Sequence, residues 1–240
     1  MVPDPLSSLA RQSGPFLNYL EGWRDALPIL SLQAAAPEPA RAAIISVDVT
    51  RGFCNEGALS SPRVAAIVPP ITRLMQGAWD YGVRSILLTQ DTHEPDAVEF
   101  AQWPAHCVRG SAEAETVAEI LALPFASQML LFEKNSIDSA ASTGLDRWIL
   151  DHPEVDTYLV VGDCTDLCTY QLAMHLRLDA NARQLSRRVI VPADCVQTYD
   201  MPVETALGLG IMPHPGDLLH ALFLYHMALN GVEVVSEIKA

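Results

Sequence analysis

The chain has 240 residues, of which 50% are hydrophobic and 18% are charged, and this composition is typical of a folded globular domain. Its 15 Lys and Arg residues against 29 Asp and Glu residues give a net charge of −14, which argues against a nucleic-acid partner. No stretch approaches the roughly 20 apolar residues of a membrane span, and the first residues lack the pattern of a signal peptide. We therefore expect a cytoplasmic protein that binds neither nucleic acid nor membrane.

Residues 1–40 differ in composition from the remainder of the chain. They contain a mixed amphipathic stretch at residues 16–32 and then the Pro-Ala run AAAPEPA at residues 34–40. Such a run is typical of a linker or of an arm that lies along a surface. We expect residues 1–40 to form an N-terminal extension and residues 41–240 to form the main domain.

From residue 42 onward, apolar runs alternate with segments of helical spacing. Six apolar runs predict buried strands, at residues 42–49, 83–91, 127–134, 155–163, 186–194 and 232–236. Helical spacing predicts helices at residues 71–82, 143–152, 166–180 and 216–231, of which the first and last end at glycines. This alternation predicts an α/β fold with three α-β-α layers and a mostly parallel sheet of about six strands.

In a sheet of this kind, ligands bind beyond the carboxyl ends of the strands. Asp48, Asp91, Lys134 and Asp163 follow or end four of the predicted strands, and Cys168 lies shortly after Asp163. Any single Asp here has an ordinary alternative role as a helix cap, and Lys134 alone could be a solvated charge. The patterns GxGxxG and GxxxxGK[ST] are absent, so we expect no nucleotide cofactor.

An Asp, a Lys and a Cys that converge at one edge of a sheet supply the groups of a thiol hydrolase. The thiolate is the nucleophile, and both a helix N-terminus and a nearby ammonium would lower the pKa of Cys168. A carboxylate can accept the thiol proton and return it to a leaving amine. The five cysteines are an odd and scattered set without secretion signals, which indicates reduced thiols, and most free cysteines simply pack as small hydrophobes.

A second cluster of polar residues lies in a long loop after the second strand. Asp91, His93, Glu99 and His106 offer carboxylate and imidazole groups, which suit a divalent ion such as zinc, manganese or iron. Long loops of this sort are usually functional or disordered. The alternative is a surface loop with ordinary polar residues.

Four segments resemble the motifs of the isochorismatase-like cysteine hydrolases, and among these the nicotinamidases. The resemblance covers the chain from about residue 42 to its C-terminus and leaves residues 1–40 unexplained. The motifs that carry it are DVTRGFCNEGALS, DTHEPDAVEFAQWPAHCVRGSAEAE, FEKNSIDS and VVGDCTDLCT. The chain departs from the usual family residues at Thr50, Gly52, Asn135 and Leu167, and these changes leave the candidate triad intact.

The resemblance implies roles for individual residues. A catalytic triad would comprise Asp48, Lys134 and Cys168, and the backbone N–H groups of Cys164 and Cys168 would form the oxyanion hole. Phe53 and Trp103 would hold a pyridine ring between them, and the peptide bond between Asp163 and Cys164 would be cis. One divalent ion would be bound by Asp91, His93, Glu99 and His106.

The resemblance also implies an activity. The domain of residues 41–240 would be a metal-dependent cysteine amidohydrolase that converts nicotinamide to nicotinate and ammonia through a thioester, in salvage toward NAD. A homo-oligomer with a small-molecule amide as substrate is implied as well. Two alternatives stay open: a related cysteine hydrolase that acts on another small amide, carbamoyl or maleamate-like, and a non-catalytic paralogue that holds a metal.

Overall fold

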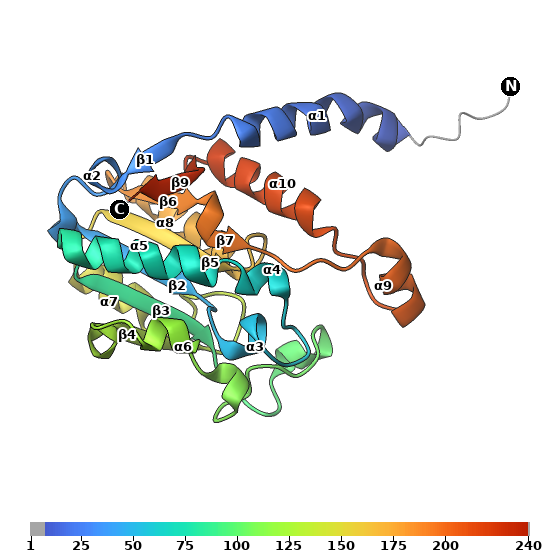
Figure 1. Cartoon of the computed structure of the whole chain (residues 1–240), viewed down its shortest axis with the longest axis horizontal. Coiled ribbons are helices and arrows are strands. Elements are labelled where there is room, and N and C mark those ends of the chain that lie inside the picture. Colours follow the sequence, from blue (N-terminus) through green and yellow to red (C-terminus); the bar gives the residue numbers. More distant parts are fainter. Residues whose placement is uncertain (1–7, 240) are drawn as a thin grey trace, which may run out of the picture.

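The computed structural model describes residues 8–239 and consists of a twisted parallel sheet covered by helices on both faces (Figure 1). The strand order is β4-β3-β2-β5-β6-β8, and a short strand β7 also pairs with β5. Every strand pair is parallel, as the alternation of apolar runs and helices predicts. The six predicted strands are present, and β7 is the seventh. The strand bounds are β2 Ala42–Val47, β3 Ser85–Asp91, β4 Leu130–Lys134, β5 Thr157–Asp163, β6 Arg188–Pro192, β7 Val196–Gln197 and β8 Glu233–Val235.

The two faces of the sheet pack against different helices. Successive side chains of a strand point to opposite faces, so Ile44 and Ile45 of β2 belong to two separate clusters of the core. The cluster of Ile44 contains α5 Val68–Tyr81. The cluster of Ile45 contains side chains of α7 Leu145–Asp151, α8 Cys168–Ala182 and α10 Gly216–Leu229. These helices and the sheet make the three expected layers.

Short helices occupy the loops around the sheet. Their bounds are α3 Arg51–Cys54, α4 Pro62–Ala65, α6 Ala118–Leu121 and α9 Val203–Leu209. The long helix α5 begins at Val68, three residues before the predicted start, because Pro69 and Pro70 suit the first turn of a helix. It ends at Tyr81, and Gly82, the predicted end, is the residue that caps it, with φ +120° and its N–H donated to the carbonyl of Ala78.

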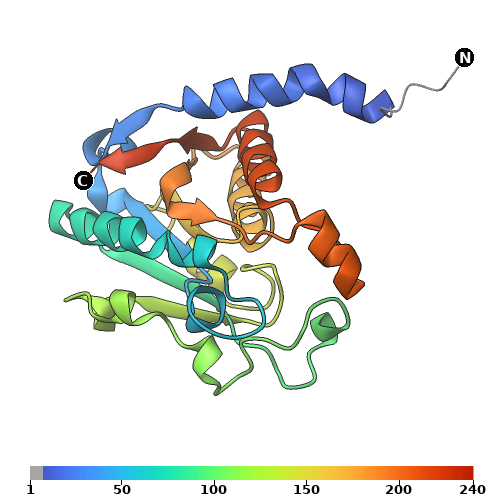
Figure 2. The same cartoon turned by 45° about the vertical axis from the view of Figure 1, so that its right-hand side comes forward.

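The N-terminal segment lies along the domain beside the C-terminal elements (Figures 1 and 2). Helix α1 Ser8–Asp25 contacts α10, where Phe16, Tyr19 and Trp23 surround Tyr225. Strand β1 Ile29–Ser31 then pairs in parallel with β9 Glu237–Lys239.

After β1, the chain forms α2 Leu32–Ala35 and continues into the predicted Pro-Ala run. Ala35 and Ala36 of that run are buried, and Arg188 donates hydrogen bonds to the carbonyls of Ala34 and Ala35. The run therefore lies against the domain and does not form a free linker. Among residues 8–239, no helix is both long and apolar enough to cross a membrane.

Candidate active site

Four neighbouring strands place ionisable groups side by side at the carboxyl edge of the sheet. Strands β4, β3 and β5 end in Lys134, Asp91 and Asp163, and Asp48 directly follows β2. Asp48 has φ +55°, so the chain turns sharply there after the strand. The strand order reverses between β2 and β5, and this switch point is where open α/β sheets bind ligands.

Lys134 lies at the centre of this group and is almost fully buried. Its Nζ atom is 2.8 Å from Asp48 Oδ2, 2.5 Å from Asp91 Oδ1 and 3.6 Å from Cys168 Sγ. The other oxygen of Asp48 accepts the backbone N–H of Asp91 at 2.7 Å. The structure thus brings together Asp48, Lys134 and Cys168, which the sequence places 34 or more residues apart.

Burial and mutual charge set the protonation of this cluster. Burial and the neighbouring Asp91 raise the pKa of Asp48 to about 6, although Lys134 opposes the shift. Burial disfavours ionisation of Asp91, but Lys134, His106 and His93 outweigh it and lower the pKa of Asp91. Burial likewise opposes the charge on Lys134, but its two carboxylate partners outweigh burial and raise the pKa of Lys134. A protonated Lys134 is therefore the cation that these two carboxylates share.

Lys134 acts on the pKa of Cys168 in the expected direction, but burial outweighs it. Burial raises the pKa of the Cys168 thiol well above its usual value, and Lys134 offsets this only in part. The thiol is buried, and its side chain belongs to the core cluster that contains side chains of α8. The resting group is consequently a thiol, and it needs a base to remove its proton.

The segment before α8 places two backbone N–H groups beside the cysteine. Cys168 is the first residue of α8, and the peptide bond between Asp163 and Cys164 is cis, as the family resemblance implied. The carbonyl of Cys164 accepts the N–H groups of Leu167 and Thr169, which closes the turn. Within residues 8–239, neither the Cys164 nor the Cys168 amide donates a hydrogen bond to another backbone group. Both are therefore available to an anion at the N-terminus of α8.

Next to the Lys134 cluster lies a group of possible metal ligands. Asp91, His93 and His106 are all buried and offer ligand atoms that lie within 4.8 Å of one another. The loop closes where the backbone of His93 bonds to Cys107 and Arg109. The Nδ1 atoms of the imidazoles are held by Asn135 Oδ1 at 3.1 Å and by the carbonyl of Pro104 at 2.8 Å.

These residues fit a divalent cation. His93 Nε2 is buried without a hydrogen-bond partner, and it lies 3.4 Å from Asp91 Oδ1. His106 Nε2 lies 3.6 Å from Asp91 Oδ2. In each imidazole the second nitrogen is fixed by an outer partner, as is usual for histidine ligands of metals. Asn135, one of the departures from the family pattern, is the residue that orients His93.

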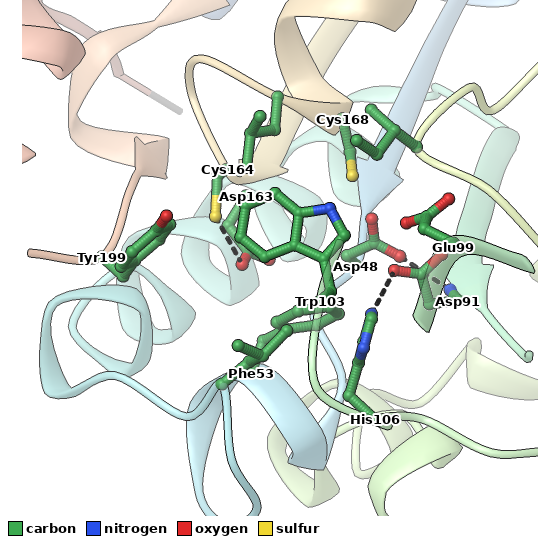
Figure 3. Close-up of a pocket in the computed structure, with 13 residues that line it drawn as sticks. Asp48, Phe53, Asp91, Glu99, Trp103, His106, Asp163, Cys164, Cys168 and Tyr199 are labelled. Carbon is green, nitrogen blue, oxygen red and sulfur yellow. Dashed lines mark hydrogen bonds and ion pairs between the residues drawn. The ribbon is translucent and has the colours of Figure 1, made fainter. Parts of the chain in front are cut away.

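Glu99 lies in the short turn Val98–Ala101 and lines the same pocket. Figure 3 shows its carboxylate on the side of Asp91, beyond Trp103. Its oxygens are not part of the compact group formed by Asp91, His93 and His106 among the described residues. The assignment of Glu99 as a fourth ligand stays a prediction.

A pocket opens above these groups, and aromatic side chains form its walls (Figure 3). It is lined by Phe53, Trp103 and Tyr199 together with Cys164 and Cys168. Phe53 comes from α3, and its ring lies 5.6 Å from that of His106. The aromatic walls and the narrow space suit a flat ring of modest size.

Tyr199 was not predicted as a site residue from the sequence. This residue lies after β7, and its ring is edge-on to that of Trp103 with 6.4 Å between centroids. The site residues predicted from strand ends belong to the first four predicted strands. Extended to the strand predicted at residues 186–194, the same rule leads to the segment that carries Tyr199.

Comparison with protein families gives one match that spans most of the domain. The model of the isochorismatase domain matches residues 42–235. This segment contains every candidate site residue and leaves out the N-terminal helix and β1.

Individual proteins are similar to the chain over comparable lengths. Nicotinamidase 1 of Arabidopsis thaliana is 28% identical over 82% of this chain and 86% of its own length. A nicotinamidase of Acinetobacter baylyi is 30% identical over 66% of this chain and 82% of its own length. A crystal structure of Pyrococcus horikoshii pyrazinamidase in complex with zinc superposes with a TM-score of 0.63 at 23% identity, covering 81% of this chain and 98% of that one. The last comparison concerns the fold alone.

Proposed function

The chain belongs to the isochorismatase family and is an amide-hydrolysing enzyme, and we propose that it hydrolyses nicotinamide to nicotinate and ammonia through a thioester on Cys168. The observation that carries this proposal is the position of Lys134. Its Nζ atom lies 2.8 Å from Asp48 and 3.6 Å from Cys168, and both of these residues line an aromatic pocket. A base, a cation and a thiol are thereby in reach of one carboxamide carbon.

The pocket fits the shape and polarity of nicotinamide. Phe53 and Trp103 offer apolar walls to the pyridine ring. The carboxamide then faces Cys168, and the polar ring nitrogen faces the end of the pocket that contains Asp91 and His106. Each part of the substrate thus meets a wall of matching polarity.

In the first half-reaction Asp48 acts as the base. The reactive atoms of Asp48 and Cys168 lie within 4.8 Å of each other, so the carboxylate takes the thiol proton as Sγ attacks the carboxamide carbon. The oxygen that becomes negative accepts hydrogen bonds from the N–H groups of Cys164 and Cys168, and loss of one such donor typically costs about 2.7–4 kcal/mol. Asp48 then gives the proton to the nitrogen, the C–N bond breaks and ammonia leaves.

The second half-reaction releases the acid. Asp48 accepts a proton from a water molecule, whose oxygen attacks the thioester carbon. The same two N–H groups stabilise the oxyanion. The C–S bond breaks and the proton returns to Sγ, and the acid leaves as nicotinate after its own proton passes to water. Lys134 stays protonated throughout and balances the negative charge that alternates between Asp48 and Sγ.

A divalent cation would be bound by Asp91, His93 and His106, with Glu99 as the predicted fourth ligand. When bound, it would supply a Lewis acid that takes up the ring nitrogen and sets the depth of the ring in the pocket. His93 and His106 are already oriented for that task through Asn135 and the carbonyl of Pro104. Which ion binds is left open by this set of ligands.

The test is ammonia release from nicotinamide by the purified protein, before and after chelation and metal return. We expect release that falls at least about 10³-fold in Cys168→Ala, because the nucleophile is lost. Cys195→Ala is the matched control, since Cys195 is also buried but does not line the pocket. We expect chelation to lower the rate and the returned ion to restore it.

Absence of release from folded, metal-loaded protein would reject nicotinamide as substrate. A panel of carbamoyl and maleamate-like amides would then be tested with the same two variants. Turnover of one of these that depends on Cys168 would favour the alternative amidohydrolase, and no turnover at all would favour a paralogue that only holds a metal.

A further inference from the structure

A second hollow, which we call the outer groove, continues from the mouth of the aromatic pocket. Leu59, Trp103 and Tyr199 line both spaces, and the outer groove extends from them to Leu207, Ile211 and Met212. We propose that the outer groove is a substrate subsite that takes an apolar substituent on the ring of an aromatic carboxamide. This inference rests on the proposed amide hydrolysis and narrows its substrate class.

The lining of the outer groove specifies the chemistry of its occupant. Leu207, Ile211 and Met212 are 70%, 49% and 87% exposed, so three large apolar side chains face water beside the pocket. Contiguous apolar surface of this kind usually marks a binding site. Among the described residues that line the groove there is no Lys, Arg or His, and the one charged residue, Asp200, is acidic. A phosphate or carboxylate is therefore disfavoured, and a neutral apolar group fits.

The wall shared by the two spaces is held in place from behind. The ring of Tyr199 stacks on that of His214, with centroids 3.8 Å apart and planes inclined by 16°. His214 Nε2 is 2.8 Å from buried Asp166 Oδ2, and its Nδ1 is 3.0 Å from the carbonyl of Tyr199. Asp166 belongs to the turn that precedes Cys168. The groove wall and the nucleophile turn are thus positioned by one buried contact.

The backbone on both sides of Tyr199 is fixed as well. Met201 and His214 exchange two backbone hydrogen bonds, at 2.7 and 2.9 Å, and the Gly216 N–H donates to Asp200 Oδ1 at 2.7 Å. The engaged Asp200 carboxylate is directed at the backbone of α10. The result is a pre-formed wall, which binds an apolar group at lower entropic cost than a mobile loop would.

The geometry also says which ring position reaches the outer groove. Figure 3 shows Tyr199 on one side of Trp103, and Asp91 and Glu99 on the other. With the carboxamide at Cys168 and the ring nitrogen toward Asp91, the ring carbon meta to both groups points away from both Cys168 and Asp91, whereas every other unsubstituted ring carbon neighbours the nitrogen or the carboxamide. A substituent there, the meta position, extends toward Tyr199. A substituent on the carbon that is beside the nitrogen and para to the carboxamide, here called the ortho position, extends into the polar end.

The experiment compares kcat/KM for nicotinamide and for its meta-butyl and ortho-butyl derivatives. We expect the meta-butyl amide to exceed nicotinamide about ten-fold, mostly through a lower KM, because part of the chain is removed from water. We expect no gain for the ortho-butyl amide. Leu207→Asp should abolish the preference for the meta-butyl amide. Leu209→Asp is the matched control, since Leu209 is an exposed residue of α9 that does not line the groove, and it should keep the preference.

Tyr199 has its own pair of variants. Tyr199→Phe keeps the stacked ring and should keep the preference, whereas Tyr199→Ser removes the wall and should raise KM for the meta-butyl amide more than for nicotinamide. The preference is the ratio of kcat/KM for the meta-butyl amide to kcat/KM for nicotinamide. A ratio of about one in the unmodified enzyme, or equal ratios in Leu207→Asp and Leu209→Asp, would overturn the proposal.

Two further measurements test the outer groove, one by binding and one by assembly. If nicotinamide is not turned over, calorimetric binding of the same amides to Cys168→Ala still decides: tighter binding of the meta-butyl amide supports the subsite, and equal binding overturns it. Sedimentation measures the assembly. A smaller assembly in Leu207→Asp with an unchanged preference would show that the outer groove joins copies of the chain, and the proposal would then be wrong.

Discussion

Lys134 is the residue on which the charges of the site depend. Its ammonium is buried between Asp48 and Asp91, and both carboxylates are themselves buried. An ion pair in this setting contributes little when complete, but the removal of one partner leaves an uncompensated charge. The stability of the fold and the chemistry of the site are therefore linked through one side chain.

We expect Lys134→Met to lower the free energy of unfolding by about 3–5 kcal/mol, because two adjacent carboxylates remain buried without a cation. The change should also abolish turnover, since Asp48 becomes harder to ionise. Urea denaturation and ammonia release measure the two effects. The double variant Lys134→Met/Asp48→Asn removes one of the two carboxylates and should recover a large part of the lost stability. A loss below about 1 kcal/mol in the single variant would contradict this account.

His220 supplies a pH dependence of stability away from the reacting groups. Its ring lies 2.9 Å from Thr165 Oγ1, and burial, with Arg63 and Arg24, lowers its pKa to about 4. In the unfolded chain His220 takes up a proton near pH 6.5, whereas in the folded protein it does so only near pH 4. Its contribution to the free energy of unfolding is therefore fully present above pH 6.5, and about 3 kcal/mol is lost as the pH falls toward 4. Denaturation of the unmodified protein and of His220→Gln across this range tests it. Equal slopes in both would refute the assignment.

At the scale of elements, β2 and β5 are pressed together where the strand order reverses. Gly162 of β5 has φ +115°, and a Cβ atom there would lie 2.0 Å from the carbonyl oxygen of Val47. This close approach places Asp48 and Asp163 side by side at the ends of two neighbouring strands. A larger residue has to separate the two strands on which the site is built.

Gly162→Ala should therefore cost about 3 kcal/mol or more in stability, through both the clash and the left-handed backbone. The control is Gly208→Ala in α9, where a Cβ would meet nothing within 4 Å. That change should stabilise the protein by about 0.5–1 kcal/mol, since Ala favours helix more than Gly. Thermal unfolding of the two variants gives opposite shifts if this account holds. Similar shifts would show that neither environment matters.

The elements that could be predicted from sequence are those whose side chains are buried on a regular pattern. Strands β2 and β5 are buried over their whole length, and an apolar run at the centre of each strand predicts it. Helix α1 has Leu20 as its one buried residue, and its start at Ser8 was missed because no apolar stripe marks it. Strand β1 is three residues long and exists through its pairing with β9, which no local pattern reveals.

In the candidate site, too, the features that follow from local sequence patterns could be predicted, and those that depend on tertiary contacts could not. The strand-end rule brought out Asp48, Asp91 and Lys134, because parallel strands deliver their ends to one edge. It did not predict the raised pKa of Cys168, which depends on how deeply α8 packs. It also did not reveal the pairing of Asp166 with His214, since 48 residues and a chain reversal separate them. Contacts made by loops across the pocket mouth need the tertiary structure.

In the molecule as a whole, the N-terminal segment packs against the C-terminal elements α10 and β9. Helix α1 packs on α10 through an aromatic cluster, while β1 and α2 cover β9 and the adjoining core. The two parts of the segment differ in burial. Leu32, Ala35 and Ala36 are almost completely enclosed, whereas most of α1 is exposed.

Two truncations should separate these parts. Removal of residues 1–26 deletes α1 and should cost about 1–3 kcal/mol, the burial of Leu20 and part of the aromatic cluster. Removal of residues 1–36 also deletes β1 and α2 and leaves Arg188 without two carbonyl partners, so the cost should exceed about 4 kcal/mol. Urea denaturation of both proteins measures the difference. If the two truncations lower the free energy of unfolding equally, the packing of β1 and α2 contributes nothing to stability.

The pairing of β1 with β9 has a consequence for how the chain is made. The two strands lie about 200 residues apart, so β1 leaves the ribosome roughly 10–40 s before its partner is synthesised. The central strands β2 to β5 can meet during that interval, while β1 waits with unpaired backbone groups. The pairing of β1 with β9 thus follows the assembly of the central strands, and a nascent chain stalled before β9 would carry an open strand edge at β1.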